Sequence, residues 1–252
     1  MHKSLIETPS KVPAVTLLFW IIKIAATTLG ETGGDAISMS MNLGYLVGTF
    51  IFAVVFIVAV ALQIRAKAFH PSLYWITIVA TTTVGTTLAD FADRSLGIGY
   101  AGGSSILLAL LLMTLAIWYV TLGTVSVDSI KTPKAETFYW VTIMFSQTLG
   151  TALGDWTADT AGLGYAGGAV IFSALLGIIA AAYFWSSLSR TLLFWAAFIL
   201  TRPLGAVVGD FLDKPVANGG LALSRYTASI VLTVFIAGCI LIFRQKAADE
   251  AH

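Results

Sequence analysis

The sequence predicts an all-α integral membrane protein with eight transmembrane helices, arranged as four tandem repeats of two helices each. The composition points to a membrane, because hydrophobic residues make up 58% of the chain and charged residues only 11%, against about 25% charged residues in soluble domains. The mean hydropathy is +0.89. Apolar stretches also recur at the length of about 20 residues that a helix needs to cross a bilayer. Finally, one pattern of tryptophan, glycine and aspartate occurs four times, which is typical of a repeat architecture.

The repeat begins at a tryptophan, with a glycine ten residues later, an aspartate fifteen residues later and a second glycine nine residues after the aspartate. The tryptophans are separated by 55, 65 and 55 residues, so the extra length lies in the middle of the chain. We therefore expect one membrane domain made of two halves, residues 1–127 and 128–252, with four spans each. An even number of spans gives both halves the same orientation, related by an axis along the membrane normal. The repeat positions are Trp20, Gly30, Asp35 and Gly44; Trp75, Gly85, Asp90 and Gly99; Trp140, Gly150, Asp155 and Gly164; and Trp195, Gly205, Asp210 and Gly219.

Each repeat contributes first a span that carries the tryptophan, glycine and aspartate, and then a second span that is more uniformly apolar. The tryptophans are expected to anchor the helices at the membrane interface, and the glycines are expected to allow close helix packing. The expected spans, in order along the chain, cover residues 13–36, 43–65, 72–91, 100–123, 137–158, 164–188, 191–211 and 224–244.

The distribution of lysine and arginine predicts the orientation of these spans. Nine such residues lie on the side that holds both termini, and only three lie on the opposite side. Because cytoplasmic loops carry an excess of lysine and arginine, we expect both termini in the cytoplasm and the four repeat aspartates toward the external face. The nine are Lys3, Lys11, Arg65, Lys67, Lys131, Lys134, Arg190, Arg244 and Lys246, and the three are Arg94, Lys214 and Arg225.

A polar stripe runs along the first span of every repeat, since residues four positions apart share one helix face. Lipid does not accept such stripes, so we expect the four helices to face one another around an interior cavity. The stripes comprise Lys23, Thr27, Glu31 and Asp35; Thr82, Thr86, Asp90 and Arg94; Gln147, Thr151, Asp155 and Asp159; and Arg202, Ala206, Asp210 and Lys214.

The acidic residues of these spans are predicted to form a metal site. Converging carboxylate oxygens suit hard cations such as magnesium, calcium or manganese, and crowded carboxylates also suit proton exchange. A soft metal is not expected, because Cys239 is the only cysteine and the three histidines lie outside the spans. Lys23 and Arg202 are the basic residues inside the spans, and we expect them to act as counter-ions that couple cation entry to proton release. The predicted metal ligands are Glu31, Asp35, Asp90, Asp93, Asp155, Asp159, Asp210 and Asp213.

The repeated tryptophan pattern resembles a family of bacterial membrane proteins defined by tandem DUF347 repeats. The resemblance rests on Trp20, Trp75, Trp140 and Trp195 and covers nearly the whole chain. It implies a bacterial inner (cytoplasmic) membrane protein with two helices in each of four repeats. It implies no substrate, so the function has to be argued from the residues.

We expect a transporter rather than an enzyme, moving a small hard cation through a carboxylate-lined central site, with proton-coupled efflux of manganese as the most specific version. The expected partners are the lipid bilayer, the cation and protons, with no cofactor and no nucleic acid, because the net charge is only +1 and there is no basic run. Homo-oligomer formation stays open. Two alternatives also stay open, namely an intramembrane enzyme of the aspartyl-protease type and a non-transporting membrane protein for binding or assembly. The enzyme alternative lacks the Gly-x-Gly-Asp and Tyr-Asp sequences of such proteases.

Overall fold

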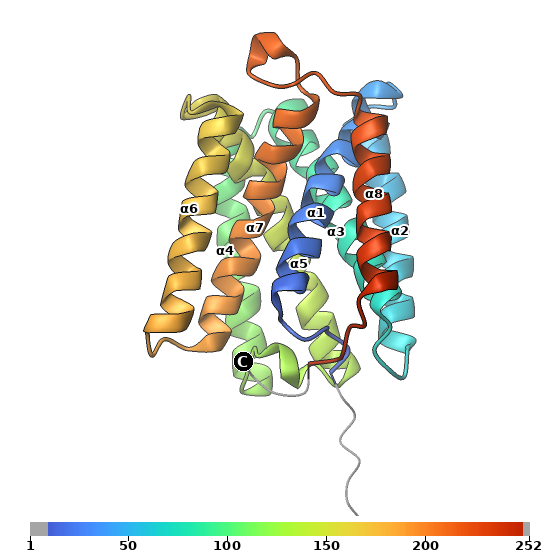
Figure 1. Cartoon of the computed structure of the whole chain (residues 1–252), viewed down its shortest axis with the longest axis vertical. Coiled ribbons are helices and arrows are strands. Elements are labelled where there is room, and N and C mark those ends of the chain that lie inside the picture. The colour runs from blue at the N-terminus through green and yellow to red at the C-terminus, as the bar shows by residue number, and fades with distance from the viewer. Residues whose placement is uncertain (1–9, 249–252) are drawn as a thin grey trace, which may run out of the picture.

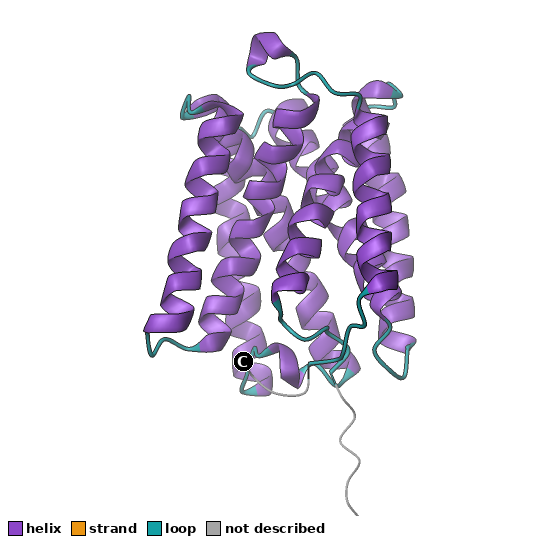
Figure 2. Cartoon of the chain, viewed as in Figure 1, coloured by secondary structure: helices purple, strands orange, loops and turns teal. Residues whose placement is uncertain are grey.

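The computed structural model describes residues 10–248, and their regular structure is helical apart from one isolated β-bridge between Pro13 and Ala247. Eight long α-helices lie side by side in this part of the chain (Figures 1 and 2), so the predicted all-α class and the predicted two helices in each repeat are confirmed. The helices are α1 (Leu17–Asp35), α2 (Tyr45–Arg65), α3 (Pro71–Asp90), α4 (Tyr100–Leu122), α5 (Pro133–Asp155), α6 (Gly164–Trp185), α7 (Arg190–Asp213) and α8 (Arg225–Ile242).

Local capping fixes where these helices begin and end. Thr16 caps α1 by accepting a hydrogen bond from the backbone N–H of Phe19, and Thr132 caps α5 before the proline that opens it, a position where proline is favoured. In the first three repeats the α-helix ends at the repeat aspartate and continues as a five-residue π-helical turn. These turns are η1 (Ala36–Ser40), η2 (Phe91–Ser95) and η4 (Trp156–Thr160), while two short 3₁₀ turns, η3 (Val127–Ser129) and η5 (Val216–Asn218), lie in connections.

Five of the helices in residues 10–248 are long and apolar enough to cross a membrane, namely α2, α4, α6, α7 and α8. The other three, α1, α3 and α5, carry the polar residues of the predicted stripes. Most residues of α1, α3, α5 and α7 are buried, whereas α2, α4, α6 and α8 bury only a few. The repeat thus divides the fold into polar inner helices and apolar outer helices.

The four inner helices form a closed ring in which α1 contacts α3 and α7, and α5 contacts the same two helices on the opposite side. Each outer helix packs mainly against the inner helix of the next repeat, so that α2 lies on α3, α4 on α5 and α6 on α7. The last outer helix, α8, closes the arrangement by packing on α1. In Figure 1, α6 marks one edge of the bundle and α2 and α8 mark the other. The outer helix of each repeat therefore contacts the inner helix of the next repeat, and the last repeat contacts the first.

The first glycine of each repeat sets the spacing within this ring. A Cβ atom at Gly205 would lie 2.5 Å from the Cβ of Thr27 and 2.8 Å from its carbonyl carbon. A Cβ at Gly30 would lie 2.6 Å from the Oγ1 of Thr82. The same relation holds in each repeat, in which the glycine faces the residue seven positions after the next tryptophan; the remaining pairs are Gly85 with Gln147 and Gly150 with Arg202. The predicted packing role is confirmed for the first glycine of each repeat, but not for the second, since Gly44, Gly99, Gly164 and Gly219 have positive φ angles and no atom within 4 Å of a Cβ.

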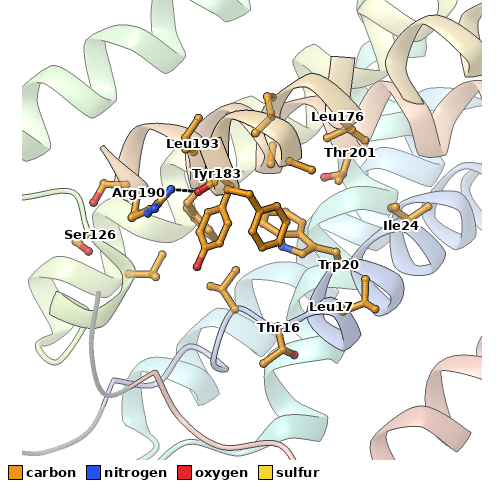
Figure 3. A pocket seen from close by; sticks show the side chains of 18 residues that line it. Thr16, Leu17, Trp20, Ile24, Ser126, Leu176, Tyr183, Arg190, Leu193 and Thr201 are labelled. Carbon is orange, nitrogen blue, oxygen red and sulfur yellow. Dashed lines mark hydrogen bonds between the residues drawn. The ribbon is translucent and has the colours of Figure 1, made fainter. Parts of the chain in front are cut away.

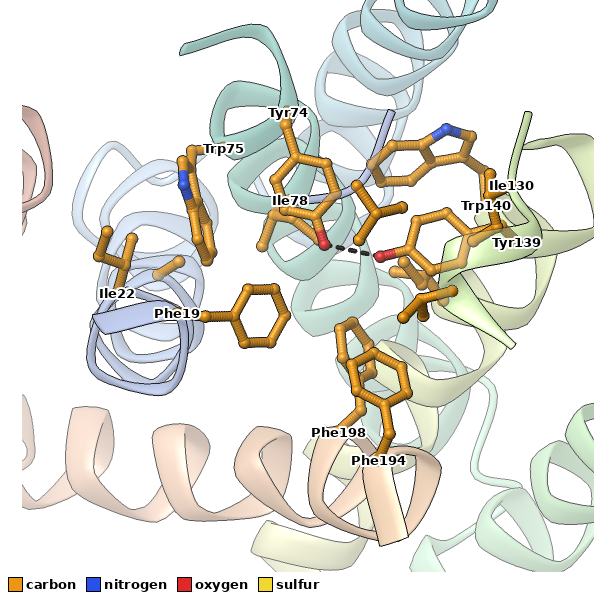
Figure 4. Close-up of a cluster of buried hydrophobic side chains, with 14 of the residues drawn as sticks. Phe19, Ile22, Tyr74, Trp75, Ile78, Ile130, Tyr139, Trp140, Phe194 and Phe198 are labelled. Carbon is orange, nitrogen blue, oxygen red and sulfur yellow. Dashed lines mark hydrogen bonds between the residues drawn. The ribbon is translucent and has the colours of Figure 1, made fainter. Parts of the chain in front are cut away.

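The prediction that the repeat tryptophans anchor the helices at the membrane interface is wrong for three of them. Trp75, Trp140 and Trp195 are buried, and they pack with other aromatic rings in a cluster near the ends of the inner helices opposite the aspartates. Figure 4 shows Trp75 and Trp140 in this cluster. For Trp75 and Trp195 the reason is that distant segments cover them. The indole N–H of Trp75 donates to the side chain of Gln245 after α8 at 2.8 Å, and that of Trp195 donates to the carbonyl oxygen of Val125 after α4 at 2.9 Å.

The basic residues divide between the two ends of the bundle. The aromatic end carries most of them, including Arg65 at the end of α2 and Arg190 at the start of α7. The aspartate end carries Arg94, Lys214 and Arg225. Lys3, which also entered the prediction of orientation, lies outside the described residues.

Candidate functional site

The polar stripes of the four inner helices are buried over most of their length, as predicted, but Arg94 and Asp159, at the ends of two stripes, are exposed. Three levels follow one another along the bundle, at seven, eleven and fifteen residues after each tryptophan. Every side chain in these levels is at most 3% exposed, which places the stripes inside the ring of inner helices. The levels are Thr27, Thr82, Gln147 and Arg202; Glu31, Thr86, Thr151 and Ala206; and Asp35, Asp90, Asp155 and Asp210.

Arg202 occupies the place where the sequence predicted an interior cavity. Its Nη2 atom lies 2.9 Å from Oε2 of Glu31, and it also donates to the hydroxyl oxygens of Thr86 and Thr151. These three acceptors belong to α1, α3 and α5, so one guanidinium on α7 connects all four inner helices. Arg202 forms an ion pair with Glu31, which is the contact expected of a counter-ion, and its predicted part in coupling cation entry to proton release stays a prediction. Gly150 leaves the space that the Arg202 side chain needs.

Lys23 does not serve as a counter-ion in this structure, in contrast to the prediction. It is fully buried, but its ammonium lies 4.1 Å from the ring centre of Phe198 and donates to the hydroxyl of Thr201 at 3.4 Å. Lys23 precedes Glu31 by eight residues, which corresponds to about 12 Å of helix, and this separation keeps it away from the carboxylates. The ring of Phe198 and the hydroxyl of Thr201 take the place of the carboxylate partner that the sequence predicted for Lys23.

The four repeat aspartates form a ring at the ends of the inner helices, bridged by two cations. Arg94 contacts Asp90 at 2.8 Å and reaches Asp155 of the next repeat at 3.4 Å. Lys214 contacts Asp210 at 2.9 Å and also pairs with Asp35 of the first repeat. The bridges therefore follow a twofold pattern, from the second repeat to the third and from the fourth to the first. The ring contains more acidic than basic groups.

The sequence placed Arg94 and Lys214 on the stripes but did not predict that they bridge neighbouring repeats. The signal was present in their spacing, because each follows its aspartate by four residues, which in an α-helix would place it one turn beyond the aspartate on the same face. The corresponding residues of the first and third repeats are Met39 and Asp159, which carry no positive charge.

Lys214, which follows the last residue of α7, is a permanent cation of this site. Burial alone would lower the pKa of its ammonium, but the carboxylates of Asp210, Asp35 and Asp213 outweigh this effect and raise the pKa well above the usual range. The charged form is therefore present at every physiological pH. A cation that is part of the chain occupies the space between two of the ring aspartates.

The other predicted ligands lie at different distances from the ring. Asp213 flanks it and pairs with Arg225 at 2.9 Å. Asp93 is buried but faces α4, where a Cβ at Gly103 would lie 2.5 Å from its Oδ1. Asp159 is exposed and accepts a hydrogen bond from the hydroxyl of Tyr100 at 3.5 Å. The structure thus brings together Glu31, Asp35, Asp90, Asp155 and Asp210, with Asp213 beside them, and leaves Asp93 and Asp159 outside.

Three of the converging carboxylates are close enough to share one ion. Glu31, Asp35 and Asp210 each present an oxygen atom, and these atoms lie within 4.8 Å of one another. All three residues are buried. The Oδ1 atom of Asp35 is also buried and has no hydrogen-bond partner within residues 10–248. A buried carboxylate oxygen without a donor has lost its hydration without replacement, so it offers a free ligand atom for a hard cation.

Comparison with known proteins identifies the repeat but not a relative of known function. No curated protein and no solved structure matches the chain. A family model described as a repeat of unknown function, DUF347, matches residues 18–69, 73–124, 138–189 and 193–246. Each matched segment contains one inner and one outer helix, so the repeat of the sequence coincides with the repeat of the structure. Because the four matches together cover most of its length, the chain belongs to the DUF347 family.

Proposed function

We propose that the protein is an eight-span membrane transporter that carries a small hard cation, such as divalent manganese, in exchange for protons. The observation that carries the proposal is the convergence of Glu31, Asp35 and Asp210 in the interior, where they already bind cations that belong to the chain itself. Ionisable groups inside a membrane are costly, and they usually mark ion pathways.

The chemistry of the site favours a hard cation over other substrates. Its ligands are carboxylate oxygens, with the hydroxyl of Thr86 within 3.3 Å of Glu31. Such oxygen ligands suit magnesium, calcium and manganese. Together with Asp213, the ring aspartates outnumber the three cations that pair with them, so the site retains negative charge that an incoming divalent ion would neutralise; the three cations are Arg94, Lys214 and Arg225.

The basic side chains of the site, above all Lys214, suggest how binding and release of the ion alternate. An ion that binds Asp35 and Asp210 takes the place of the Lys214 ammonium, which moves aside. When the ion leaves, Lys214 returns, and the carboxylates are never left without a positive partner. Protonation of the remaining carboxylates provides the coupled proton flux. Arg202 with Glu31 closes the path deeper in the bundle, because this ion pair lies between the aspartate ring and the aromatic cluster.

The two ends of the bundle differ, and this difference supports one side from which an ion reaches the carboxylates. The buried aromatic cluster closes one end, so an ion in this conformation reaches the carboxylates from the aspartate end. Because most of the lysine and arginine residues lie at the aromatic end, we place that end, with both termini, on the cytoplasmic side of a bacterial inner membrane. In this proposal the helices α1, α3 and α5 complete the eight spans, since their polar faces are turned toward the other inner helices and outer helices pack against them on the other side.

The proposal is tested by reconstitution in liposomes that contain a metal-sensitive dye and a pH-sensitive dye. Wild-type protein is expected to carry manganese and protons in opposite directions. Asp35→Asn removes a central ligand and is expected to abolish both signals, whereas Asp159→Asn, at an exposed position outside the ring, is expected to leave both unchanged. Folding of each variant is checked by its helical content. Absence of flux for every divalent cation with folded wild-type protein would reject transport and favour a binding or assembly role.

A further inference from the structure

A second site lies on the side of the bundle, away from the aspartate ring. A cavity of about 400 Å³ opens between α1, α6 and α7 (Figure 3). Its walls are aromatic and aliphatic and include Trp20, Leu176 and Phe194. Leu17 and Phe184 lie at its mouth and are 76% and 73% exposed, so the cavity opens toward the lipid-facing perimeter of the bundle. It does not depend on the proposed transport function.

The repeat architecture indicates that this cavity lacks a cover that the other repeats have. Trp75 and Trp195 are sealed by Gln245 and by the backbone at Val125, and Trp140 is only 2% exposed. Trp20 is the corresponding residue of the first repeat, but it is only partly buried and lines the cavity. Its indole N–H makes no hydrogen bond within residues 10–248. The position that protein fills in three repeats is therefore open to a ligand in the first.

The two ends of the cavity differ in polarity. Arg190 and Ser126 lie together at one side in Figure 3, whereas Ile24 and Leu176 lie at the other. The guanidinium of Arg190 lies 4.3 Å from the ring centre of Tyr183 and donates to the Tyr183 carbonyl oxygen. This contact fixes the guanidinium at the rim, and a guanidinium has five N–H donors, so others stay free to bind a phosphate.

We propose that this cavity binds an anionic glycerophospholipid, with one acyl chain along the apolar wall beside Trp20 and the phosphate at Arg190. The occupant follows from three features that coincide at this place: an apolar interior, a mouth on the lipid-facing side, and an arginine at the end of the bundle where the basic residues gather. Basic pockets between transmembrane helices on that side favour anionic headgroups.

The test uses the full chain in vesicles of phosphatidylcholine that contain a small fraction of lipid with brominated acyl chains, which quench tryptophan fluorescence on contact. The brominated lipid is either phosphatidylglycerol or phosphatidylcholine. The difference in tryptophan fluorescence between wild type and Trp20→Phe isolates the signal of Trp20. We expect brominated phosphatidylglycerol to quench this signal at about fivefold lower mole fraction than brominated phosphatidylcholine, since one arginine contributes about a factor of five near an anionic headgroup.

Two variants distinguish recognition at the cavity from general attraction to the basic end. Arg190→Gln is expected to remove the preference for phosphatidylglycerol, and Arg65→Gln, at the end of α2, is expected to retain it. Native mass spectrometry of the same variants counts retained phosphatidylglycerol independently of fluorescence. Equal quenching of Trp20 by both lipids, or equal retention of phosphatidylglycerol by wild type and Arg190→Gln, would overturn the proposal. Absence of any Trp20 quenching would overturn it as well.

Discussion

Replacing Gly205 by alanine tests whether the ring of inner helices closes through the contact between α7 and α1. The new Cβ would lie 2.5 Å from the Cβ of Thr27 and 2.8 Å from its carbonyl carbon. Carbon atoms in contact are normally about 3.5 Å apart or more. Thr27 Oγ1 is closer still and can rotate away, but the Cβ and the carbonyl carbon of Thr27 cannot, so the two helices have to separate by about 1 Å. The hydrogen bond from Thr27 Oγ1 to the carbonyl oxygen of Thr201, at 3.2 Å, is strained by the same movement.

The expected cost follows from this displacement. Overpacking in a well-packed core costs about 1–3 kcal/mol, while alanine gains about 1 kcal/mol over glycine in helix propensity. Gly33→Ala is the matched control, because its Cβ would meet only the Ser229 hydroxyl at 3.9 Å and so reports the propensity gain alone. The free energy of unfolding, measured by denaturant titration in detergent, should be lower for Gly205→Ala than for Gly33→Ala by about 1–3 kcal/mol. Equal values for the two variants would refute the close contact between α7 and α1.

The remaining predictions concern the charged groups. Glu31→Gln leaves the buried Arg202 guanidinium without its carboxylate and should cost about 3–5 kcal/mol of unfolding free energy, whereas Glu31→Gln combined with Arg202→Met should recover most of that loss; additive effects in this double-mutant cycle would show that the two residues do not interact. Because the pKa of Lys214 is raised, its contribution to stability is complete below the ordinary lysine pKa and is lost only as the pH rises through the higher folded value. The wild type should therefore keep its advantage in thermal stability over Lys214→Met from about pH 7 to about pH 10, and a decline of that advantage within this range would contradict the prediction.

The helices and the buried stripes could be predicted from the sequence because they depend on local periodicity. A tryptophan, glycine and aspartate at fixed spacing place the same side chains on the same face of each inner helix, and this face has to be turned away from lipid. Gly30 and Gly205 indicated close packing for the same reason, although only the structure shows that each faces the next repeat around a closed ring.

The position of the tryptophans could not be predicted in this way, because burial depends on partners far along the chain. Gln245 lies 170 residues from Trp75, and Val125 lies 70 residues from Trp195. A sequence pattern that describes one helix carries no information about which segment will cover it. The indole rings were therefore assigned to the membrane interface, which is the usual place for an amphipathic ring with no known partner.

The candidate site was predicted in part, and its errors have a geometric cause. Asp159 and Arg94 occupy the same repeat position, and both lie in π-helical turns that follow the repeat aspartate. The hydrogen bonds of a π-helical turn join residues five apart instead of four apart, so residues four apart no longer share one face of the helix. The long side chain of Arg94 still reaches back to Asp90 and Asp155, whereas the short side chain of Asp159 remains at the surface.

Direct measurement of manganese binding tests the central claim that the axial carboxylates, those of Glu31, Asp35 and Asp210, form a cation site. The electron paramagnetic resonance signal of free Mn²⁺ is recorded as purified protein is added, for wild type, Asp35→Asn and Asp159→Asn. The signal should decrease with wild type and with Asp159→Asn, and it should remain unchanged with Asp35→Asn. If the wild type leaves the signal unchanged, or if Asp35→Asn binds manganese as tightly as the wild type does, the axial carboxylates do not bind the ion.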